Sequence, residues 1–172
     1  LATPMSIMVG VGRGAQAGVL VRNAEALERL EKVDTLVVDK TGTLTQGRPS
    51  VTAIRTADGC EETELLRMAA SVERASSHPL AGAIVAAATA RGLTPSAPRD
   101  VEQTIGKGVS GIVEGRRILV GTAGFLAERG IDTPVLAAAA AALRSGGATA
   151  VYVAIDDVAA GVLGISDPVK RS

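Results

Sequence analysis

The pattern of apolar and polar positions at the start of the chain predicts two helices and a buried strand. Residues 1–11 are apolar at nearly every position, which is typical of the end of a longer apolar helix, and we expect a sequence cut at both ends. From residue 15 to 33 apolar positions recur at helical spacing, which predicts an amphipathic helix. Residues 35–38 are continuously apolar or β-branched, which predicts a strand buried on both faces and followed by Asp39. Open α/β sheets place chemistry at that end of a strand.

From about residue 47 the pattern changes and predicts a second unit of mixed helices and strands. Three short apolar runs succeed one another through turns between residues 101 and 121, and two more flank Asp156 and Asp157. Such close succession favours an antiparallel sheet. The predicted strands are 51–57, 101–105, 109–114, 116–121, 149–155 and 158–165, and the predicted helices are 61–75, 79–91, 122–129 and 134–144.

Composition and charge narrow the classes of function. The 172-residue chain is 47% hydrophobic with a formal net charge of zero, so it is long enough for a core and has no electrostatic footprint for nucleic acid or an anionic membrane surface. One tyrosine and one phenylalanine leave the core to aliphatic side chains and offer few platforms for stacking bases. The single cysteine, Cys60, cannot form an internal disulfide, and we expect it to be an exposed loop residue.

The strongest chemical signal is DKTGTLT at residues 39–45, directly after the predicted buried strand. A carboxylate followed by a hydroxyl- and glycine-rich turn is suited to face phosphate, and Asp39 could attack a γ-phosphoryl group to give an aspartyl phosphate. Transfer depends on positioning and charge neutralisation, which Mg²⁺, Lys40 and turn amides opened by Gly42 could supply. The alternative for a lone Asp at such a place is a turn cap. The seven-residue string favours the catalytic interpretation.

A second group of candidates lies inside the predicted second unit and consists of Glu73, His78, Gly106, Gly108 and Gly121. Each is weak alone. His78, the only histidine, precedes a proline that suits the first turn of a helix, so its local interpretation is a helix N-terminal residue near solvent. The stretch from Gly106 also fits the Gly-x-Gly-x-x-Gly spacing, but a strand-like run follows where a dinucleotide site needs a helix. A dinucleotide site is therefore not favoured.

Taken together, DKTGTLT and the second group resemble heavy-metal P-type ATPases, in particular their copper(I)-exporting subgroup, and the match spans the whole chain. The resemblance implies a haloacid dehalogenase-like fold in which Asp39 is phosphorylated and Mg²⁺ binds at Asp39 and Thr41. In phosphatases that resemble this fold, a second Asp two positions after the nucleophile activates water. Here that position is Thr41, so the acyl phosphate should persist, which favours a pump over a phosphatase.

The same resemblance assigns the second group to ATP. It implies that His78 contacts adenine and that Glu73 binds the amino edge of the base. It also implies that Gly106 and Gly108 let the backbone approach the nucleotide closely, because a residue without a Cβ permits this. Gly121 belongs to the same implied pocket.

Two positions depart from the family pattern. Ser77 stands where Glu is usual, and Thr122 stands where an Asn commonly contacts ribose or phosphate, so we expect an altered affinity with the same mode of binding. Near the end, residues 167–170 resemble the hinge by which the inserted domain rejoins the phosphorylation domain, where Asp167 and a basic residue lie near the nucleotide. A plain turn is the alternative.

The expected architecture is α/β: a truncated dehalogenase-like phosphorylation domain with an inserted α+β nucleotide-binding domain, in which helices flank an antiparallel sheet. The expected parts are the end of a membrane helix at 1–18, the first part of the phosphorylation domain at 19–46, the nucleotide-binding domain at 47–164 and the return hinge at 165–172.

For the intact protein, the resemblance implies ATP-driven transport of copper(I), with this region at the cytoplasmic face of a cell membrane. Soft thiolate ligands suit copper(I) or silver(I), but they are expected upstream, and no ligand of the transported ion is expected in this chain. An ATPase for silver, zinc or cadmium and a phosphatase of the same fold are the alternatives. We expect the isolated chain to bind ATP without turning it over, because residues completing the Mg²⁺ site would follow Ser172.

Overall fold

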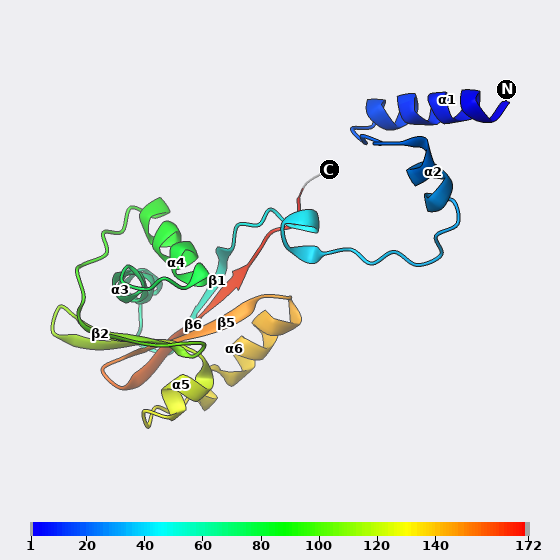
Figure 1. The fold of residues 1–172 in the computed structure, drawn as a ribbon. Helices are drawn as coiled ribbons and strands as arrows, with labels where there is room; N and C mark the ends of the chain where they lie inside the picture. The colour runs from blue at the N-terminus through cyan, green and yellow to red at the C-terminus, as the bar shows by residue number, and fades with distance from the viewer. Residues whose placement is uncertain (1, 171–172) are drawn as a thin grey trace. The chain divides into compact units, whose positions relative to one another are not determined.

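The computed structural model describes residues 2–170, and the chain divides into two compact units between Val38 and Asp39. The first unit contains α1 (Ala2–Gln16) and α2 (Ala24–Leu30) (Figure 1). Within the described residues, no helix combines the length and the apolar character needed to cross a bilayer.

The single helix predicted over residues 15–33 is wrong in its bounds, because a turn divides the segment. Helical structure ends at Gln16, and Gly18 adopts the left-handed conformation with φ of +79°, which favours glycine. The next helix begins after Asn23, whose Oδ1 accepts a hydrogen bond from the Ala26 N–H at 2.9 Å. A left-handed glycine and an asparagine cap are stop and start signals that here outweigh the apolar spacing.

The buried strand predicted over residues 35–38 is not formed. The segment pairs with no strand between residues 2 and 170, and Leu36 and Val37 are 73% and 92% exposed. A strand is stable where neighbours satisfy its backbone groups and cover its side chains. The described part of the chain supplies no such neighbour for this run.

The second unit is built on a six-stranded antiparallel sheet in the order β1-β6-β5-β4-β3-β2. The strands are β1 (Ser50–Thr56), β2 (Arg99–Thr104), β3 (Gly108–Val113), β4 (Arg116–Gly121), β5 (Thr149–Ile155) and β6 (Val158–Ser166), and the helices are α3 (Glu62–Glu73), α4 (Pro79–Ala90), α5 (Ala123–Ala127) and α6 (Pro134–Ser145). Figure 1 shows α3 and α4 on one face of the sheet and α5 and α6 on the other. The predicted antiparallel sheet flanked by helices is confirmed.

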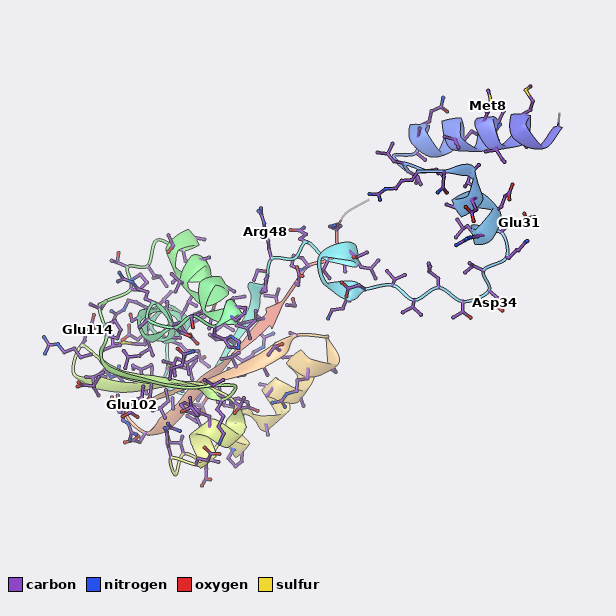
Figure 2. All side chains as sticks on the ribbon, in the orientation of Figure 1. Met8, Glu31, Asp34, Arg48, Glu102 and Glu114 are labelled. Carbon is purple, nitrogen blue, oxygen red and sulfur yellow. The ribbon has the colours of Figure 1, made fainter. Side chains whose placement is uncertain are left out.

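Alternation along the strands gives the sheet two apolar faces. In β5, Val151 and Val153 belong to the core beneath α3 and α4, whereas Tyr152 and Ala154 belong to the core beneath α5 and α6. Phe125 of α5 is fully buried in the second core. Aliphatic side chains fill nearly all the rest, as the composition predicts, and Figure 2 shows side chains crowded between the layers of this unit.

Every strand and helix predicted for the second unit is present, with ends shifted by at most one or two residues. Asp156 and Asp157 are both left-handed, with φ of 51° and 62°, and form the predicted tight turn between β5 and β6. The prediction for Cys60 is wrong in part: the residue is half-buried against the core beneath α3, and this burial raises the pKa of its thiol. The apolar core beside its loop covers it.

Candidate functional site

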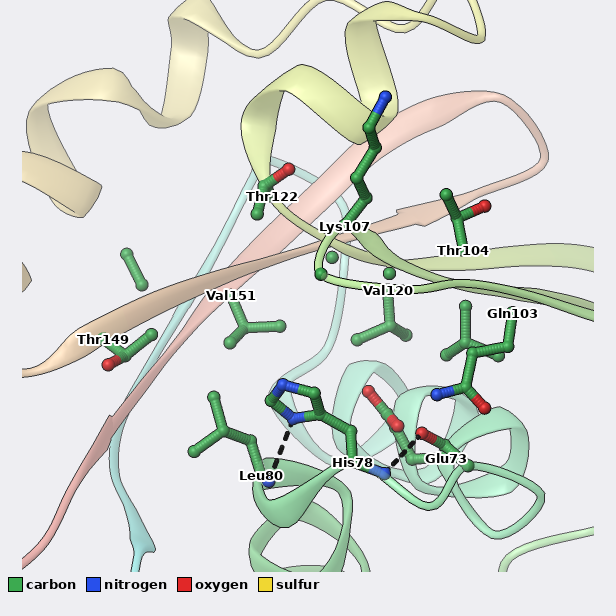
Figure 3. Close-up of a pocket in the computed structure, with 16 residues that line it drawn as sticks. Glu73, His78, Leu80, Gln103, Thr104, Lys107, Val120, Thr122, Thr149 and Val151 are labelled. Atoms are coloured by element: carbon green, nitrogen blue, oxygen red, sulfur yellow. Dashed lines mark hydrogen bonds between the residues drawn. The ribbon is translucent and has the colours of Figure 1, made fainter.

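A pocket of about 190 Å³ opens between the start of α4 and the turns that leave β2 and β4 (Figure 3). Its lining includes Glu73, His78, Gly106, Gly108 and Gly121, the whole second group of candidates. These residues come from the end of α3, the start of α4, the β2–β3 turn and the facing ends of β3 and β4. The structure therefore brings together residues that are far apart in the sequence.

Glu73, the last residue of α3, places a buried carboxylate at this pocket. The residue is 7% exposed, and no residue described by the structure gives its Oε2 a hydrogen bond. Burial raises the pKa of this carboxyl, and a hydrogen bond with Ser76 opposes the shift. A buried acceptor without a donor costs about 1–3 kcal/mol, so the site suits a ligand that donates hydrogen bonds.

His78 is the N-cap of α4, as its place before Pro79 predicts, and it also lines the pocket. Its Nδ1 accepts a hydrogen bond from the Leu80 N–H at 3.1 Å. In a neutral imidazole this bond leaves the proton on Nε2, where it can be donated to a ligand. Figure 3 shows the ring and the Glu73 carboxylate beside one another, opposite the sheet.

Gly108 and Gly121 face one another in β3 and β4, and both have a packing role in addition to lining the pocket. A Cβ added to Gly108 would lie 2.7 Å from the Phe125 ring, and one added to Gly121 would lie 2.8 Å from it. Both distances are shorter than any tolerated contact, so the packing of Phe125 on the sheet already requires both glycines. Gly106 is different, because it has open space around it and a left-handed φ of +73° in the β2–β3 turn.

Sequence reasoning missed the apolar floor of the pocket. Val109, Val120 and Val151 contribute it from three adjacent strands, and Leu80 contributes from α4. The alternating pattern of β3 and β4 next to their glycines was a signal that could have identified Val109 and Val120. An apolar floor with a few polar groups at its margin is usual for small-molecule sites.

Lys107 and Thr122 stand on the opposite margin from His78 (Figure 3). Lys107 is the one lysine or arginine among the described residues that line the pocket, and its Nζ lies 2.6 Å from Oε1 of Glu128. Thr122 is the N-cap of α5, and its Oγ1 accepts a hydrogen bond from the Phe125 N–H at 3.1 Å. Thr122, which stands where the family commonly has Asn, therefore uses its hydroxyl to cap the helix.

Asp39 is the first residue of the second unit and lies directly before η1 (Lys40–Leu44), a single π-helical turn. It is exposed, and its side chain caps no amide of that turn, so the turn-cap interpretation is not realised. Gly42 adopts a left-handed φ of +77°, and its N–H donates to Thr45 Oγ1 at 3.1 Å. The side chain of Thr41 lies outside what the structure describes. Neither Asp39 nor Lys40 lines the pocket, so the two groups of candidates remain separate here.

Asp167 connects the two ends of the second unit and does not line the pocket. Its Oδ2 accepts hydrogen bonds from the Thr45 hydroxyl and from the Gly47 N–H at 3.0 Å. Its Oδ1 accepts one from the Arg48 N–H at 3.0 Å. The Thr45 hydroxyl first, and then the two amides, hold the pKa of Asp167 below its usual value. The carboxylate is therefore committed to the chain segment that follows η1.

Further bonds run beside this carboxylate. Thr45 and Val169 form an antiparallel bridge, and the Gln46 N–H donates to the Pro168 carbonyl at 2.9 Å. Lys170 Nζ donates to the Gly42 carbonyl at 2.7 Å. The segments that lead into and out of the sheet therefore lie side by side.

The described residues contain no group of three or more His, Cys, Asp or Glu side chains that could hold a metal ion. Asp39 nevertheless offers an exposed carboxylate. Mg²⁺ is commonly bound by one or two carboxylates together with substrate phosphates and water. The residues present therefore fit a magnesium ion held jointly with a nucleotide, and do not form a protein cage for it.

The family profile of the haloacid dehalogenase-like hydrolases matches residues 33–170. A silver-exporting P-type ATPase of Salmonella typhimurium is 56% identical over all 172 residues of this chain and 21% of its own length. A copper-exporting P-type ATPase of Legionella pneumophila is 51% identical over all of this chain and 23% of its own length. The chain thus spans about a fifth of the length of these curated relatives.

Solved structures agree with these relatives. A zinc-transporting PIB-type ATPase in its E2.Pi state superposes with a TM-score of 0.80 at 37% identity, over 98% of this chain and 27% of that structure. The N-domain of HMA6, a copper-transporting P-type ATPase, superposes with a TM-score of 0.58 at 31% identity, over 69% of this chain and 99% of that domain.

Proposed function

This chain belongs to the haloacid dehalogenase-like hydrolases, and on that premise we propose that it is the ATP-binding and phosphorylation region of a P-type ATPase that transports copper(I) through an aspartyl-phosphate intermediate. One observation carries the proposal. The buried Oε2 of Glu73 has no hydrogen-bond partner among the described residues, and it lies beside the His78 imidazole in a pocket with an apolar floor.

Adenine matches the chemistry of this pocket. Its exocyclic amino group would donate to Glu73 Oε2 and so remove the cost of the unsatisfied acceptor. Its ring would lie against Val120 and Val151, with the Nε2–H of His78 available to a ring nitrogen. The pocket is smaller than the about 300–1,000 Å³ that encloses a drug-sized ligand, so the base is held inside and the phosphates extend over the margin.

The phosphoryl acceptor in this proposal is Asp39. One of its carboxylate oxygens forms a bond to the γ-phosphorus while the bond from that phosphorus to the β–γ bridging oxygen breaks, and ADP leaves with the electron pair. Lys40, next in the chain, contributes positive charge close to the transferring group. Because pocket and acceptor are separate here, transfer requires the two parts to approach one another by motion at the segments around Thr45 and Val169.

Asp39 and Thr41 would hold Mg²⁺ together with the nucleotide. When bound, the ion supplies charge neutralisation at the phosphate oxygens. Position 41 offers a hydroxyl where a phosphatase of this fold has a carboxylate, so water lacks a neighbouring base. The phosphorylated Asp39 therefore persists, which suits a pump that changes conformation between phosphorylation and hydrolysis.

Transport of copper(I) is proposed for the whole protein. It is supported by curated relatives named as silver- and copper-exporting P-type ATPases. Soft monovalent ions of this kind bind thiolate and thioether ligands, and the ligands of the transported ion are proposed to lie outside this chain. In the intact protein this region would occupy the cytoplasmic side of the membrane, where ATP is available.

The experiment that tests the site is calorimetric titration of the 172-residue chain with ATP and with GTP. GTP presents a carbonyl oxygen where adenine presents an amino group, so it should bind at least about tenfold more weakly, because two acceptors would then face each other. Glu73→Gln should weaken the binding of ATP and reduce the difference in affinity between ATP and GTP, since an amide can donate to the guanine carbonyl. His78→Gln should weaken both nucleotides.

Glu61→Gln is the matched control, because Glu61 is exposed and lies outside the pocket, and it should behave as the wild type. Equal affinities of the wild type for ATP and GTP, or unchanged ATP binding by Glu73→Gln and His78→Gln, would refute the assignment of this pocket to adenine.

A further inference from the structure

We propose that Lys107 binds the phosphate chain of the nucleotide, and that Glu128 competes with this chain for the lysine ammonium group. The inference rests on the proposed function. It names the residue pair that determines how much the phosphates of a ligand contribute to its affinity for the site. Neither residue was assigned a role from the sequence.

The first argument is the charge of the lining. Among the described lining residues, Glu73 is the one acidic side chain and Lys107 the one lysine or arginine, and they lie on opposite margins of the apolar floor (Figure 3). An adenine ring bound at Glu73 and His78 directs the ribose and phosphates of the nucleotide toward the other margin. The triphosphate carries several negative charges, and Lys107 is the cation that this margin offers.

The second argument is the present position of Lys107. Figure 3 shows its side chain extending away from Glu73 and His78, and its Nζ contacts Glu128 Oε1 at 2.6 Å. The side chains of the pair are 47% and 53% exposed. Exposed pairs of this kind are weak and easily exchanged. The ammonium group can therefore leave Glu128 for a more highly charged anion through rotation of its own side chain.

The third argument is that the backbones of both residues are fixed, so the exchange needs no refolding. The Thr122 N–H donates to the Lys107 carbonyl at 2.9 Å, which ties the β2–β3 turn to the start of α5. Phe125 anchors that helix in the space left by Gly108 and Gly121. Glu128 directly follows the helix, and its N–H donates to the Gly124 carbonyl at 3.0 Å. The carboxylate is thereby held within reach of the lysine.

This arrangement predicts a phosphate-dependent competition. Removing the carboxylate frees Lys107 and strengthens binding of ligands that carry phosphates, whereas a nucleoside without phosphate is indifferent to both residues. Removing the lysine abolishes the effect of Glu128 altogether. Glu128 therefore lowers the affinity for ATP and favours its release.

The test is a double-mutant cycle on the 172-residue chain, with calorimetric titration of ATP and of adenosine into the wild type, Glu128→Gln, Lys107→Met and the double variant. Glu128→Gln should bind ATP about two- to fivefold more tightly, and Lys107→Met should bind it about five- to twentyfold more weakly. The double variant should match Lys107→Met. Adenosine should bind all four proteins equally.

Glu62→Gln removes the exposed Arg91–Glu62 ion pair, which lies outside the pocket, and should leave ATP affinity unchanged. Thermal unfolding of each variant shows whether a change in affinity reflects loss of the fold. If ATP and adenosine both bind but Glu128→Gln leaves ATP affinity unchanged or lower, or if Lys107→Met weakens adenosine as much as ATP, this inference alone is overturned. If the wild type binds neither ligand, the proposed function falls with it.

Discussion

Two regions carry the candidate chemistry, and they differ in what supports them. Glu73 and His78 lie at the ends of helices packed on a six-stranded sheet, within a pocket whose floor comes from three strands of that sheet. Asp39 follows an extended apolar run in which Val37 is 92% exposed, and it precedes one irregular turn. Asp167 secures the segment after that turn through three hydrogen bonds.

The difference separates the region proposed to bind the nucleotide from the region proposed to accept the phosphoryl group. A pocket made by a complete sheet and its own helices needs nothing further for binding, because its elements already cover one another. The acceptor segment carries a strand-like sequence without strand neighbours among the described residues. We therefore expect nucleotide binding in this chain and phosphoryl transfer in the whole protein. Four experiments can break or sharpen this contrast.

The largest effect is expected at Asp39. In the whole protein that we propose to be a P-type ATPase, Asp39→Asn should lower acid-stable labelling from γ-³²P ATP by at least about a thousandfold, because the nucleophilic carboxylate is lost. ATP binding to the 172-residue chain with the same change should remain that of the wild type, since Asp39 does not line the pocket. Persistence of the label in Asp39→Asn would rule out this residue as the acceptor.

A large loss of stability is expected at the glycine pair. Gly121→Ala would place a Cβ 2.5 Å from the Lys107 carbonyl oxygen and 2.8 Å from the Phe125 ring, and should lower the free energy of unfolding by about 2–3 kcal/mol in urea denaturation. Gly82→Ala in α4 is the matched control, because nothing lies within 4 Å of its Cβ position. It should be neutral or stabilise by up to about 1 kcal/mol. Equal stability of the two variants would contradict the packing role of Gly121.

A moderate, pH-dependent effect is expected at Glu73. Its folded-state pKa is raised, so its contribution to stability is fully present below the unfolded pKa and is lost as pH rises through the raised value. Glu73→Gln cannot ionise, so it should flatten that decline and gain about 1–2 kcal/mol at neutral pH. Urea denaturation of both proteins between pH 4 and about pH 8 measures this. Parallel pH profiles would show that the Glu73 carboxylate is not desolvated.

The smallest effect is expected at Asp167. Its folded-state pKa is lowered, so its contribution is present above the unfolded pKa and is lost as pH falls through the folded value. Asp167→Asn should speed hydrogen exchange at the Gly47 and Arg48 amides, which bond its carboxylate, while ATP affinity stays unchanged. Asp157→Asn, which alters an exposed pair with Arg117, should leave both amides as they are. Slow exchange in Asp167→Asn would mean that other bonds hold this segment.

The sequence predicted the second unit well because its signals are local. Strand alternation, a proline in the first turn of α4 and the paired aspartates between β5 and β6 each specify structure over a few residues. The failures have the opposite cause. The run at 35–38 reads as a strand, but strands depend on partners, and the segment at 15–33 has helical spacing that a left-handed Gly18 interrupts. The spacing of apolar residues does not show whether a strand has partners, nor whether one residue adopts a backbone conformation that ends a helix.

The site was predicted only as far as motifs reach. Glu73, His78 and the three glycines were found, and they do line one pocket. The unsatisfied oxygen of Glu73 and the contact between Lys107 and Glu128 have no sequence signal, because each depends on elements that meet only after folding. The three glycines were selected from the sequence for a nucleotide pocket, and the structure adds that two of them, Gly108 and Gly121, also make room for Phe125.

The bridge between Thr45 and Val169, together with the pairing of β1 with β6, means that the chain enters and leaves the sheet unit at neighbouring points. A host protein that receives such a unit in one of its loops has almost no gap to span and therefore incurs little loop-closure entropy. The same geometry would let the unit be transplanted between host proteins, or be rejoined into a circularly permuted chain, without loss of the β1–β6 pairing.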